Sequence, residues 1–232
     1  MLREGWAKPS RVMVLLVLVA ISASLAGEYV DQTRPDTPSQ TKDNFPPQLS
    51  SWDTSLFLWV NVGLSNPSVG RILSILTLLG SLSASVILCG FLFLAGQRRM
   101  GIIASASIIL VTAITMTLKV VVARPRPFMV VPGALAVDLE GGSSFPSGHA
   151  SRVSSLLHLT RGRSWKPRLV GYSLAGSVVF SRVYLGVHYP LDVLGGIVLG
   201  LASGLVVRRY ERRFVPRVEE AMERLGISSS NP

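Results

Sequence analysis

His188 and Asp192, where the apolar stretch Pro190–Val207 begins, have the spacing of a nucleophile and its orienting partner. His188 and Asp192 are four residues apart, so they share one face if a helix begins at Tyr189 and Pro190, where proline is tolerated. A carboxylate on one ring nitrogen fixes the imidazole tautomer and raises the basicity of the other nitrogen. His188 could then attack phosphorus, while His149 protonates the leaving oxygen.

Three cations lie in segments that could converge on the same point. Lys119 and Arg126 are seven positions apart, and Pro125 and Pro127 end any helix there, so Arg126 is expected on a turn just beyond the lysine. Arg182 is the third cation, and arginine offers oxygen atoms a bidentate fork. A single cation of this kind is explained by a long side chain that extends its charge into water at the membrane surface. Three on one face favour a phosphate site.

The stretch "FPSGHAS" at 145–151 has the start signals of a helix. Pro146 and Ser147 suit a helix beginning, and Gly148 has no side chain to block an anion from the first free N–H groups. Alone, this pattern indicates a plain helix cap, but here it coincides with His149. No third histidine or carboxylate completes a ligand set, so we expect no metal. His158 is expected to be structural.

The composition indicates an integral membrane protein. Of 232 residues, 48% are hydrophobic and 16% charged, with a mean hydropathy of +0.44. The net charge of +10 could suggest nucleic acid, but no basic face with a binding motif or aromatic platform is visible, so no nucleic-acid partner is expected. The single cysteine, Cys89, excludes an intrachain disulfide and is expected to be a small buried hydrophobe.

Apolar stretches predict an all-α bundle of six transmembrane helices. Each approaches the roughly 20 residues that a bilayer requires, except a shorter and more polar fourth. The six ranges are Val12–Gly27, Ile72–Gly96, Gly101–Val122, Ser147–Thr160, Arg168–Val187 and Pro190–Val207. The first could instead be a cleaved signal peptide, since basic residues precede it and "SLA" at 24–26 resembles a cleavage site.

The predicted organisation has four parts. Residues 1–27 hold the first helix, 28–50 form an external polar loop, 51–207 form the core and 208–232 form a basic cytoplasmic tail that looks helical and frays. Apolar residues at helical spacing, from Leu49 to Val60, predict an amphipathic helix, either in the outer interface or packed on the bundle.

The distribution of Lys and Arg predicts the orientation. With the N-terminus inside, 15 of the 23 basic residues lie in inner segments and seven in outer ones, while Arg152 lies within the fourth helix. The positive-inside rule therefore favours a multi-pass cell-membrane protein with both termini cytoplasmic. In this arrangement the candidate site faces outward.

Three ordered blocks of the sequence resemble the type 2 phosphatidic acid phosphatase superfamily, which also includes vanadium haloperoxidases. They are "KVVVARPRP" at 119–127, "PSGH" at 146–149 and "SRVYLGVHYPLD" at 181–192, with each fixed position at the family's spacing. The likeness covers roughly residues 50–207, including "WDTSLFLWVN" and "LLGS".

The resemblance implies a metal-independent phosphatase without a cofactor. By this likeness His188 forms a phosphohistidine, Asp192 orients it and His149 protonates the leaving group. The phosphate would be held by Lys119, Arg126, Ser147, Gly148 and Arg182. Its partners would be a phosphorylated lipid substrate and the surrounding membrane lipids.

Two further arginines raise the possibility of a second phosphate. Arg152 lies one turn after His149, and Arg124 lies inside the first block. "FPSGHAxR" with "RPRP" is similar to isoprenoid diphosphate phosphatases, which favours a polyprenyl diphosphate of the undecaprenyl type as substrate. Arg152 could equally pair with a carboxylate or a lipid head. Phosphatidic acid and phosphatidylglycerophosphate are alternative substrates, and a vanadate-dependent haloperoxidase or a non-catalytic membrane protein are less favoured interpretations.

Overall fold

All the regular elements in the part of the chain that the structure describes are helices. In this computed structural model, residues 45–137 and 140–225 are described. No strand occurs among them, which confirms the all-α prediction, whereas the predicted helix or signal at Val12–Gly27 lies outside them. The helices are α2 (Pro47–Leu58), α3 (Pro67–Thr77), α4 (Leu82–Leu94), α5 (Arg98–Val122), α6 (Pro127–Val130), α7 (Gly148–Leu156), α8 (Trp165–Tyr184) and α9 (Pro190–Arg224).

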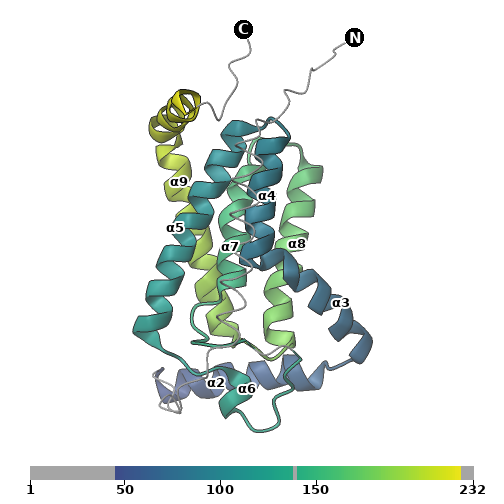
Figure 1. Ribbon diagram of the computed structural model, residues 1–232. Coiled ribbons are helices and arrows are strands. Elements are labelled where there is room, and N and C mark those ends of the chain that lie inside the picture. The colour runs from purple at the N-terminus through teal and green to yellow at the C-terminus, as the bar shows by residue number, and fades with distance from the viewer. Residues whose placement is uncertain (1–44, 138–139, 226–232) are drawn as a thin grey trace.

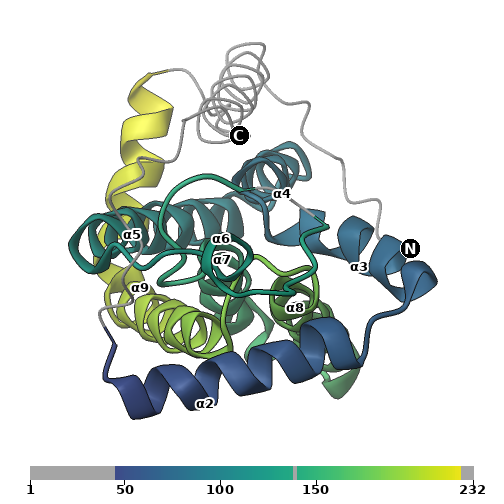
Figure 2. The same cartoon turned by 90° about the horizontal axis from the view of Figure 1, so that it is seen from below.

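Most of the longer described helices run along a bundle, and α2 lies across its end. Figure 1 shows α4, α5, α7, α8 and α9 roughly upright, with α2 crossing below them. Seen from that end, α7 occupies the middle, with α4, α5, α8 and α9 around it (Figure 2). Because neighbours cover it, most of α7 is buried although it is rich in serine. Ser151 and Ser155 satisfy their hydroxyls on backbone carbonyls of the preceding turn.

Glycines let α9 pack directly against α7. Gly196, Gly200 and Gly204 recur every fourth residue along one face of α9. A Cβ atom on Gly200 would lie 2.3 Å from the carbonyl oxygen of Ser151, so only glycine fits there. This small-residue spacing allows close backbone approach between helices.

Two described helical stretches are long and apolar enough to cross a bilayer, namely Arg98–Val130 and Pro190–Arg224. A third is possible if Pro47–Gly63 and Pro67–Gly80, bent by 114°, count together. The predicted continuous helix over 72–96 is wrong, because Ser81 has extended backbone and caps α4 by accepting the Ala84 N–H. The six-helix count stays a prediction.

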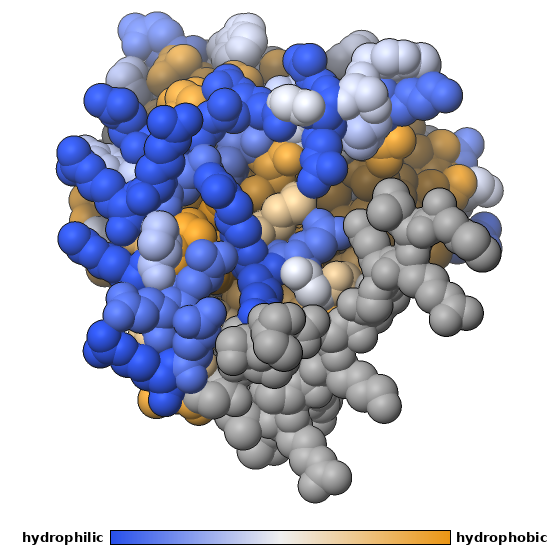
Figure 3. Space-filling view, turned by 90° about the horizontal axis from the view of Figure 1, so that it is seen from above, coloured by the Kyte–Doolittle hydropathy of each residue, from blue (hydrophilic) through white to orange (hydrophobic). Residues whose placement is uncertain are grey.

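The end of the bundle opposite α2 is strongly hydrophilic. Figure 3 shows polar residues crowding this end around a few apolar ones. The helix α9 continues past the predicted boundary at Val207 to Arg224 and carries basic residues with it. Exposed cations also come from the starts of α5 and α8 and from the turn before α8. Together they include Arg99, Arg161, Arg163, Lys166, Arg168, Arg208, Arg209, Arg212 and Arg213.

Candidate active site

Four helix ends meet near α2 and bring the predicted residues together. Both α5 and α8 end there, and both α7 and α9 begin there (Figures 1 and 2). We call the four basic side chains around this point the cationic cup: Arg126, His149, Arg182 and His188. These cup residues are up to 62 positions apart along the chain.

Arg126 leaves the end of α5 on a short extended segment. Ala123 closes α5 in a left-handed conformation with φ of 50°, and the prolines on either side of Arg126 prevent the helix from resuming. The Arg126 guanidinium is buried and donates to the carbonyl oxygens of Gly141 at 2.9 Å and Gly142 at 3.0 Å. Its Nη1 lies 3.4 Å from Nε2 of His188. These contacts fix Arg126 beside the proposed nucleophile.

The other two cations come from α8 and α5. Arg182, in the last turn of α8, is fully buried and donates to Oγ1 of Thr77 at 2.7 Å. Lys119, in the last turn of α5, donates to the carbonyl oxygen of Ser143. Lys119 thus lies against the segment that leads into "PSGH", whereas Arg182 points into the cup.

An unpredicted carboxylate, Glu140, lies inside the cup. One oxygen pairs with Arg182 and lies 3.8 Å from Nδ1 of His149. The other lies 3.1 Å from Nη1 of Arg126 and 3.9 Å from Nε2 of His188. Burial alone would raise the pKa of Glu140, but Arg182 and Arg126 hold it well below its usual range. The cup therefore holds an ionised anion.

His188 and Asp192 have the predicted relationship on the turn that starts α9. Nδ1 of His188 faces Oδ2 of Asp192 at 3.7 Å, too long for a hydrogen bond, and Nε2 faces the cup. The same Oδ2 accepts the Tyr189 N–H at 2.8 Å. Burial lowers the pKa of His188 to about 3 despite the opposing effect of Asp192, so the ring is neutral near pH 7.

Ser147 and Gly148 begin α7 beside these groups. The Ser147 hydroxyl accepts the Ala150 N–H at 3.5 Å, and its own N–H donates to the backbone carbonyl of Asp192 at 2.9 Å. A Cβ atom on Gly148 would come within 3.2 Å of Nη1 of Arg152, so the glycine makes room for that guanidinium. Arg152 also donates from Nε to the carbonyl of Gly80 at 2.9 Å. Its predicted contact with a second phosphate stays a prediction.

Arg124, the other suggested ligand of a second phosphate, points elsewhere. Its Nη1 pairs with Asp192 and with Asp53 of α2, each at 2.8 Å. These contacts favour a role in holding Asp192 over contact with a phosphate.

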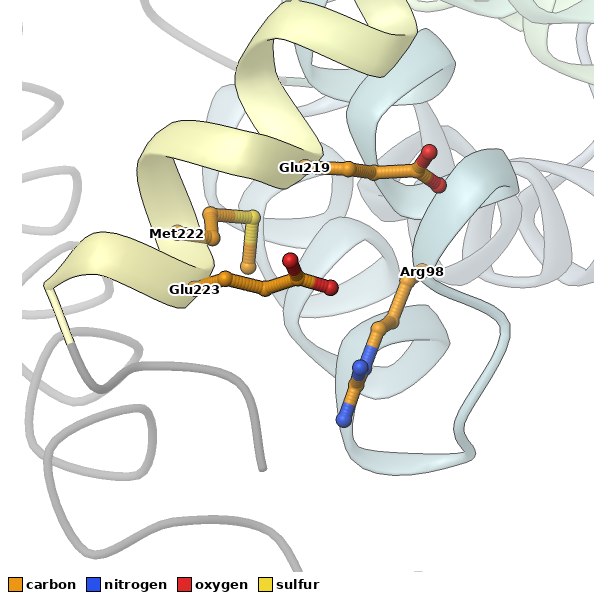
Figure 4. Close-up of a pocket in the computed structure, with 4 residues that line it drawn as sticks. All are labelled: Arg98, Glu219, Met222 and Glu223. Atoms are coloured by element: carbon orange, nitrogen blue, oxygen red, sulfur yellow. The ribbon is translucent and has the colours of Figure 1, made fainter. Parts of the chain in front are cut away.

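The remaining candidates lie away from the cup. His158, in the 3₁₀ turn after α7, is bonded through Nδ1 to the carbonyl oxygen of Ser155 at 2.6 Å, as a structural residue would be. Within the described ranges, no three His, Cys, Asp or Glu side chains are grouped to hold a metal. A pocket at the far end, lined by Arg98 of α5 with Glu219, Met222 and Glu223 of α9, contains none of the predicted site residues (Figure 4).

Sequence reasoning missed Glu140, Thr77 and Asp53. Glu140 lies in an irregular loop between α6 and α7, where no periodicity predicts the direction of a side chain. Thr77 and Asp53 lie on helices, but their contacts with Arg182 and Arg124 join residues 105 and 71 positions apart. Asp53 does stand in the quoted stretch "WDTSLFLWVN", although nothing in that stretch indicates its partner.

The chain is similar to several curated proteins over part of its length. It is 35% identical over 120 residues to decaprenylphosphoryl-5-phosphoribose phosphatase of Mycobacterium tuberculosis, a match covering 52% of this chain and 66% of the relative. With undecaprenyl-diphosphatase of Sulfolobus acidocaldarius it shares 38% over 108 residues, 44% and 51% of the two chains. With putative undecaprenyl-diphosphatase YbjG of Escherichia coli it shares 32% over 114 residues, 48% and 57%. The chain thus spans less than two thirds of the length of these relatives.

Solved structures and a family comparison agree on the fold. Aquifex aeolicus LpxE matches with a TM-score of 0.66 at 24% identity, covering 74% of this chain and 100% of that one. A membrane PAP2-type phosphatidylglycerolphosphate phosphatase of Bacillus subtilis matches with a TM-score of 0.63 at 21% identity, covering 87% and 95%. The model of the PAP2 superfamily matches residues 100–216, which include every residue of the cationic cup. With just over half of its length matched in this way, the chain belongs to the PAP2 superfamily.

Proposed function

We propose that the chain is a membrane-integral phosphatase that hydrolyses a polyprenyl diphosphate through a phosphohistidine intermediate. The observation that carries this proposal is the position of Glu140. A two-oxygen anion already lies between Arg126 and Arg182 and in front of His149 and His188. A phosphoryl group that took its place would meet the same four side chains, and donors fixed around developing charge stabilise a transition state.

In the first step, neutral His188 attacks the terminal phosphorus with Nε2, the ring nitrogen that faces the cup. A phosphorus–nitrogen bond forms as the bond to the bridging oxygen breaks. His149, protonated in response to the negative charge of the bound diphosphate, gives its proton to that oxygen, and the polyprenyl monophosphate leaves. The proton on Nδ1 of His188 points toward Asp192, whose carboxylate stabilises the positive charge that develops on the ring.

In the second step, water attacks the phosphohistidine. His149 accepts a proton from the water, the phosphorus–nitrogen bond breaks and inorganic phosphate is released. His188 returns to its neutral form, which its low pKa favours. Arg126 and Arg182 remain paired with the phosphoryl oxygens throughout, since both are buried and held by other groups.

The substrate assignment rests on the relatives. Besides the undecaprenyl-diphosphatases of Sulfolobus acidocaldarius and Escherichia coli, undecaprenyl-diphosphatase BcrC of Bacillus subtilis is 33% identical to this chain over 98 residues. Phosphatidylglycerophosphate is the second candidate, because phosphatidylglycerophosphatase B of Bacillus subtilis is 34% identical over 85 residues. Both substrates present a terminal phosphate on a lipid.

We also propose six transmembrane helices, with both termini cytoplasmic and the cup near the outer membrane face. Exposed arginines lie at the opposite end of the bundle, as the positive-inside rule expects of a cytoplasmic face, and Figure 3 shows that this end is hydrophilic. At the cup end, α2 exposes Trp52, and Trp59 follows it, with 52% and 61% of these residues accessible. Tryptophan is enriched where a membrane meets water.

Phosphate release by the purified protein in detergent tests the substrate. We expect a polyprenyl diphosphate to be hydrolysed faster than phosphatidic acid, phosphatidylglycerophosphate or a soluble sugar phosphate. Acid quenching should trap a phosphoryl group on His188. If none of the four substrates releases phosphate, the proposal is refuted. A preference for phosphatidylglycerophosphate would select the second candidate.

Labelling in intact cells tests the orientation. Ser55 of α2 and Arg212 of α9 are both exposed, so a cysteine at either position can react, whereas the native Cys89 is buried. A membrane-impermeant thiol reagent should modify Ser55→Cys and spare Arg212→Cys. The reverse pattern would place the cup in the cytoplasm.

A further inference from the structure

Behind Asp192, a buried ion network joins the start of α9 to α2. Nη1 of Arg124 lies 2.8 Å from Oδ1 of Asp192 and 2.8 Å from Oδ2 of Asp53, and all three residues are completely buried. The other oxygen of Asp53 accepts the Leu191 N–H at 2.9 Å. A single guanidinium nitrogen therefore bridges a carboxylate of α2 and one of α9.

Aromatic rings fix the orientation of the bridging arginine. The Arg124 Cζ lies 3.9 Å from the centre of the Tyr189 ring and 4.4 Å from that of Phe45. Tyr189 directly follows the nucleophile, and its N–H binds the Asp192 oxygen that faces His188. Each oxygen of Asp192 thus has its own partner, so the carboxylate has little freedom to turn away from the imidazole.

We propose that Arg124 and Asp53 are positioning residues that set the orientation and charge of Asp192, and through it the basicity of His188. This inference rests on the proposed catalytic role of the His188–Asp192 pair. It also gives α2, which lies outside the matched range 100–216, a direct connection to the reaction centre. The alternative is that the network only holds α2 on the bundle, since buried ion pairs can be structural.

A positioning role and a purely structural role of this network predict different effects on the pKa of the His188 imidazole. Arg124 offsets part of the negative charge that Asp192 presents to His188. Removing the Arg124 cation should therefore raise the pKa of His188, whereas removing the Asp53 charge should leave Asp192 as the one carboxylate on Nη1 and should not raise it. The other charged or titratable groups facing His188 stay unchanged in both variants: Arg126, Glu140, His149 and Arg182.

The test measures the titration of His188 by nitrogen-15 NMR of histidine-labelled protein in detergent. The variant His188→Gln identifies the His188 signals. We expect the ring to stay neutral down to mildly acidic pH in the wild type, to gain a proton nearer neutrality in Arg124→Met, and to behave as wild type in Arg124→Lys. Asp53→Asn should show no upward shift. This readout needs no enzymatic turnover, so it stands even if the proposed substrate is wrong.

Phosphate release gives the second readout. Arg124→Met should slow turnover roughly 10- to 100-fold, the effect that outer partners have on a ligating group, and Arg124→Lys should restore part of it. If Arg124→Met does not fold, the double variant with Asp53→Asn removes both charges, and a smaller upward shift is expected, because the lost Asp53 charge offsets part of the effect. Ser55→Ala, on the exposed face of α2, is the control. A fall in activity with an unmoved His188 titration in every variant would overturn the proposal, as would upward shifts in both Arg124→Met and Asp53→Asn.

Discussion

Arg124 and Arg126 differ in what surrounds them, although only one proline separates them. Arg126 lies in front of the His188–Asp192 pair, bound to three backbone carbonyls and to the part-exposed Glu140. Arg124 lies behind the pair, enclosed by two buried carboxylates and two aromatic rings. In front, the anion is a part-exposed side chain, whose place a substrate phosphate is proposed to take. Behind, the anions belong to the fold.

The backbone explains why the two arginines diverge. Arg126 has φ of −78° and ψ of 150°, which are polyproline II dihedrals, and the prolines beside it favour the same conformation. That helix has three residues per turn, so residues two apart point in different directions. The motif "RPRP" therefore supplies one arginine to each side of the proposed nucleophile, His188.

The largest effect on phosphate release is expected at His188, which lies between the front and the back of the site. His188→Asn should reduce phosphate release by at least about 10⁴-fold, since loss of a nucleophile removes the chemical step itself. The ring is buried, and asparagine occupies part of its volume. Phosphate release and acid-quench trapping of the phosphoenzyme measure the loss. Activity within tenfold of wild type, in protein that elutes normally on size exclusion, would mean that another residue attacks phosphorus.

A front-side variant should reduce both turnover and anion affinity. Arg182→Gln removes a cation that pairs with the anion in the cup, so we expect turnover to fall about 10²- to 10³-fold. Inhibition by vanadate, a phosphate analogue, should weaken as well. Arg168→Gln is the matched control, because Arg168 is exposed on the same helix.

A variant of Arg124, at the back of the site, tests whether this effect is specific to the front. Arg124→Lys should leave vanadate inhibition unchanged, since Arg124 faces carboxylates of the fold. If Arg182→Gln binds vanadate as wild type does while Arg124→Lys loses it, the front and back roles are reversed.

The sequence predicts the front of the site better than its back. Motif spacing predicts Arg126 and Arg182 as partners of one anion, because helix ends and proline stops are local signals, and both contact Glu140. It also predicts Lys119 as a third partner, whereas Lys119 donates to the carbonyl oxygen of Ser143. It cannot predict that Asp53 reaches Arg124, because that contact depends on how α2 lies across the bundle. Likewise, hydrophobic length alone predicts one helix over 72–96, while the break at Ser81 comes from a capping hydroxyl within it.

The glycine face of α9 links the two sides, since this helix carries Asp192 and packs on the start of α7. A Cβ atom on Gly196 would lie 2.6 Å from the carbonyl oxygen of Ser147, so Gly196→Ala must shift the turn that precedes His149. We expect a destabilisation of about 1–3 kcal/mol, typical of overpacking, and slower turnover. Thermal unfolding in detergent measures the first effect.

Gly176→Ala is the control for this packing. Gly176 lies within helix α8, and no heavy atom comes within 4 Å of the position that an alanine methyl would occupy, so alanine should be neutral or stabilise by up to about 1 kcal/mol. Equal melting temperatures for Gly196→Ala and Gly176→Ala would show that the start of α7 is not set by contact with α9.

The smallest predicted effect concerns the anion already in front of the pair. Glu140→Gln keeps the side-chain shape but removes the charge that competes with an incoming phosphate, so vanadate should inhibit about tenfold more strongly, a gain of about 1.4 kcal/mol in binding. Because Arg182 and Arg126 hold the pKa of Glu140 well below its usual range, the wild-type carboxylate stays ionised down to acidic pH. Mild acid should therefore not reproduce the effect of the variant.

A matched control separates this local competition from a change in net charge. Glu220→Gln also removes one carboxylate, but from an exposed pair with Arg224 at the far end of α9, where an ion pair contributes little. Vanadate inhibition should be unchanged in that variant. Weaker inhibition in Glu140→Gln would mean that the carboxylate organises Arg126 and Arg182 for the phosphate, and that the front of the site, like its back, depends on an anion built into the fold.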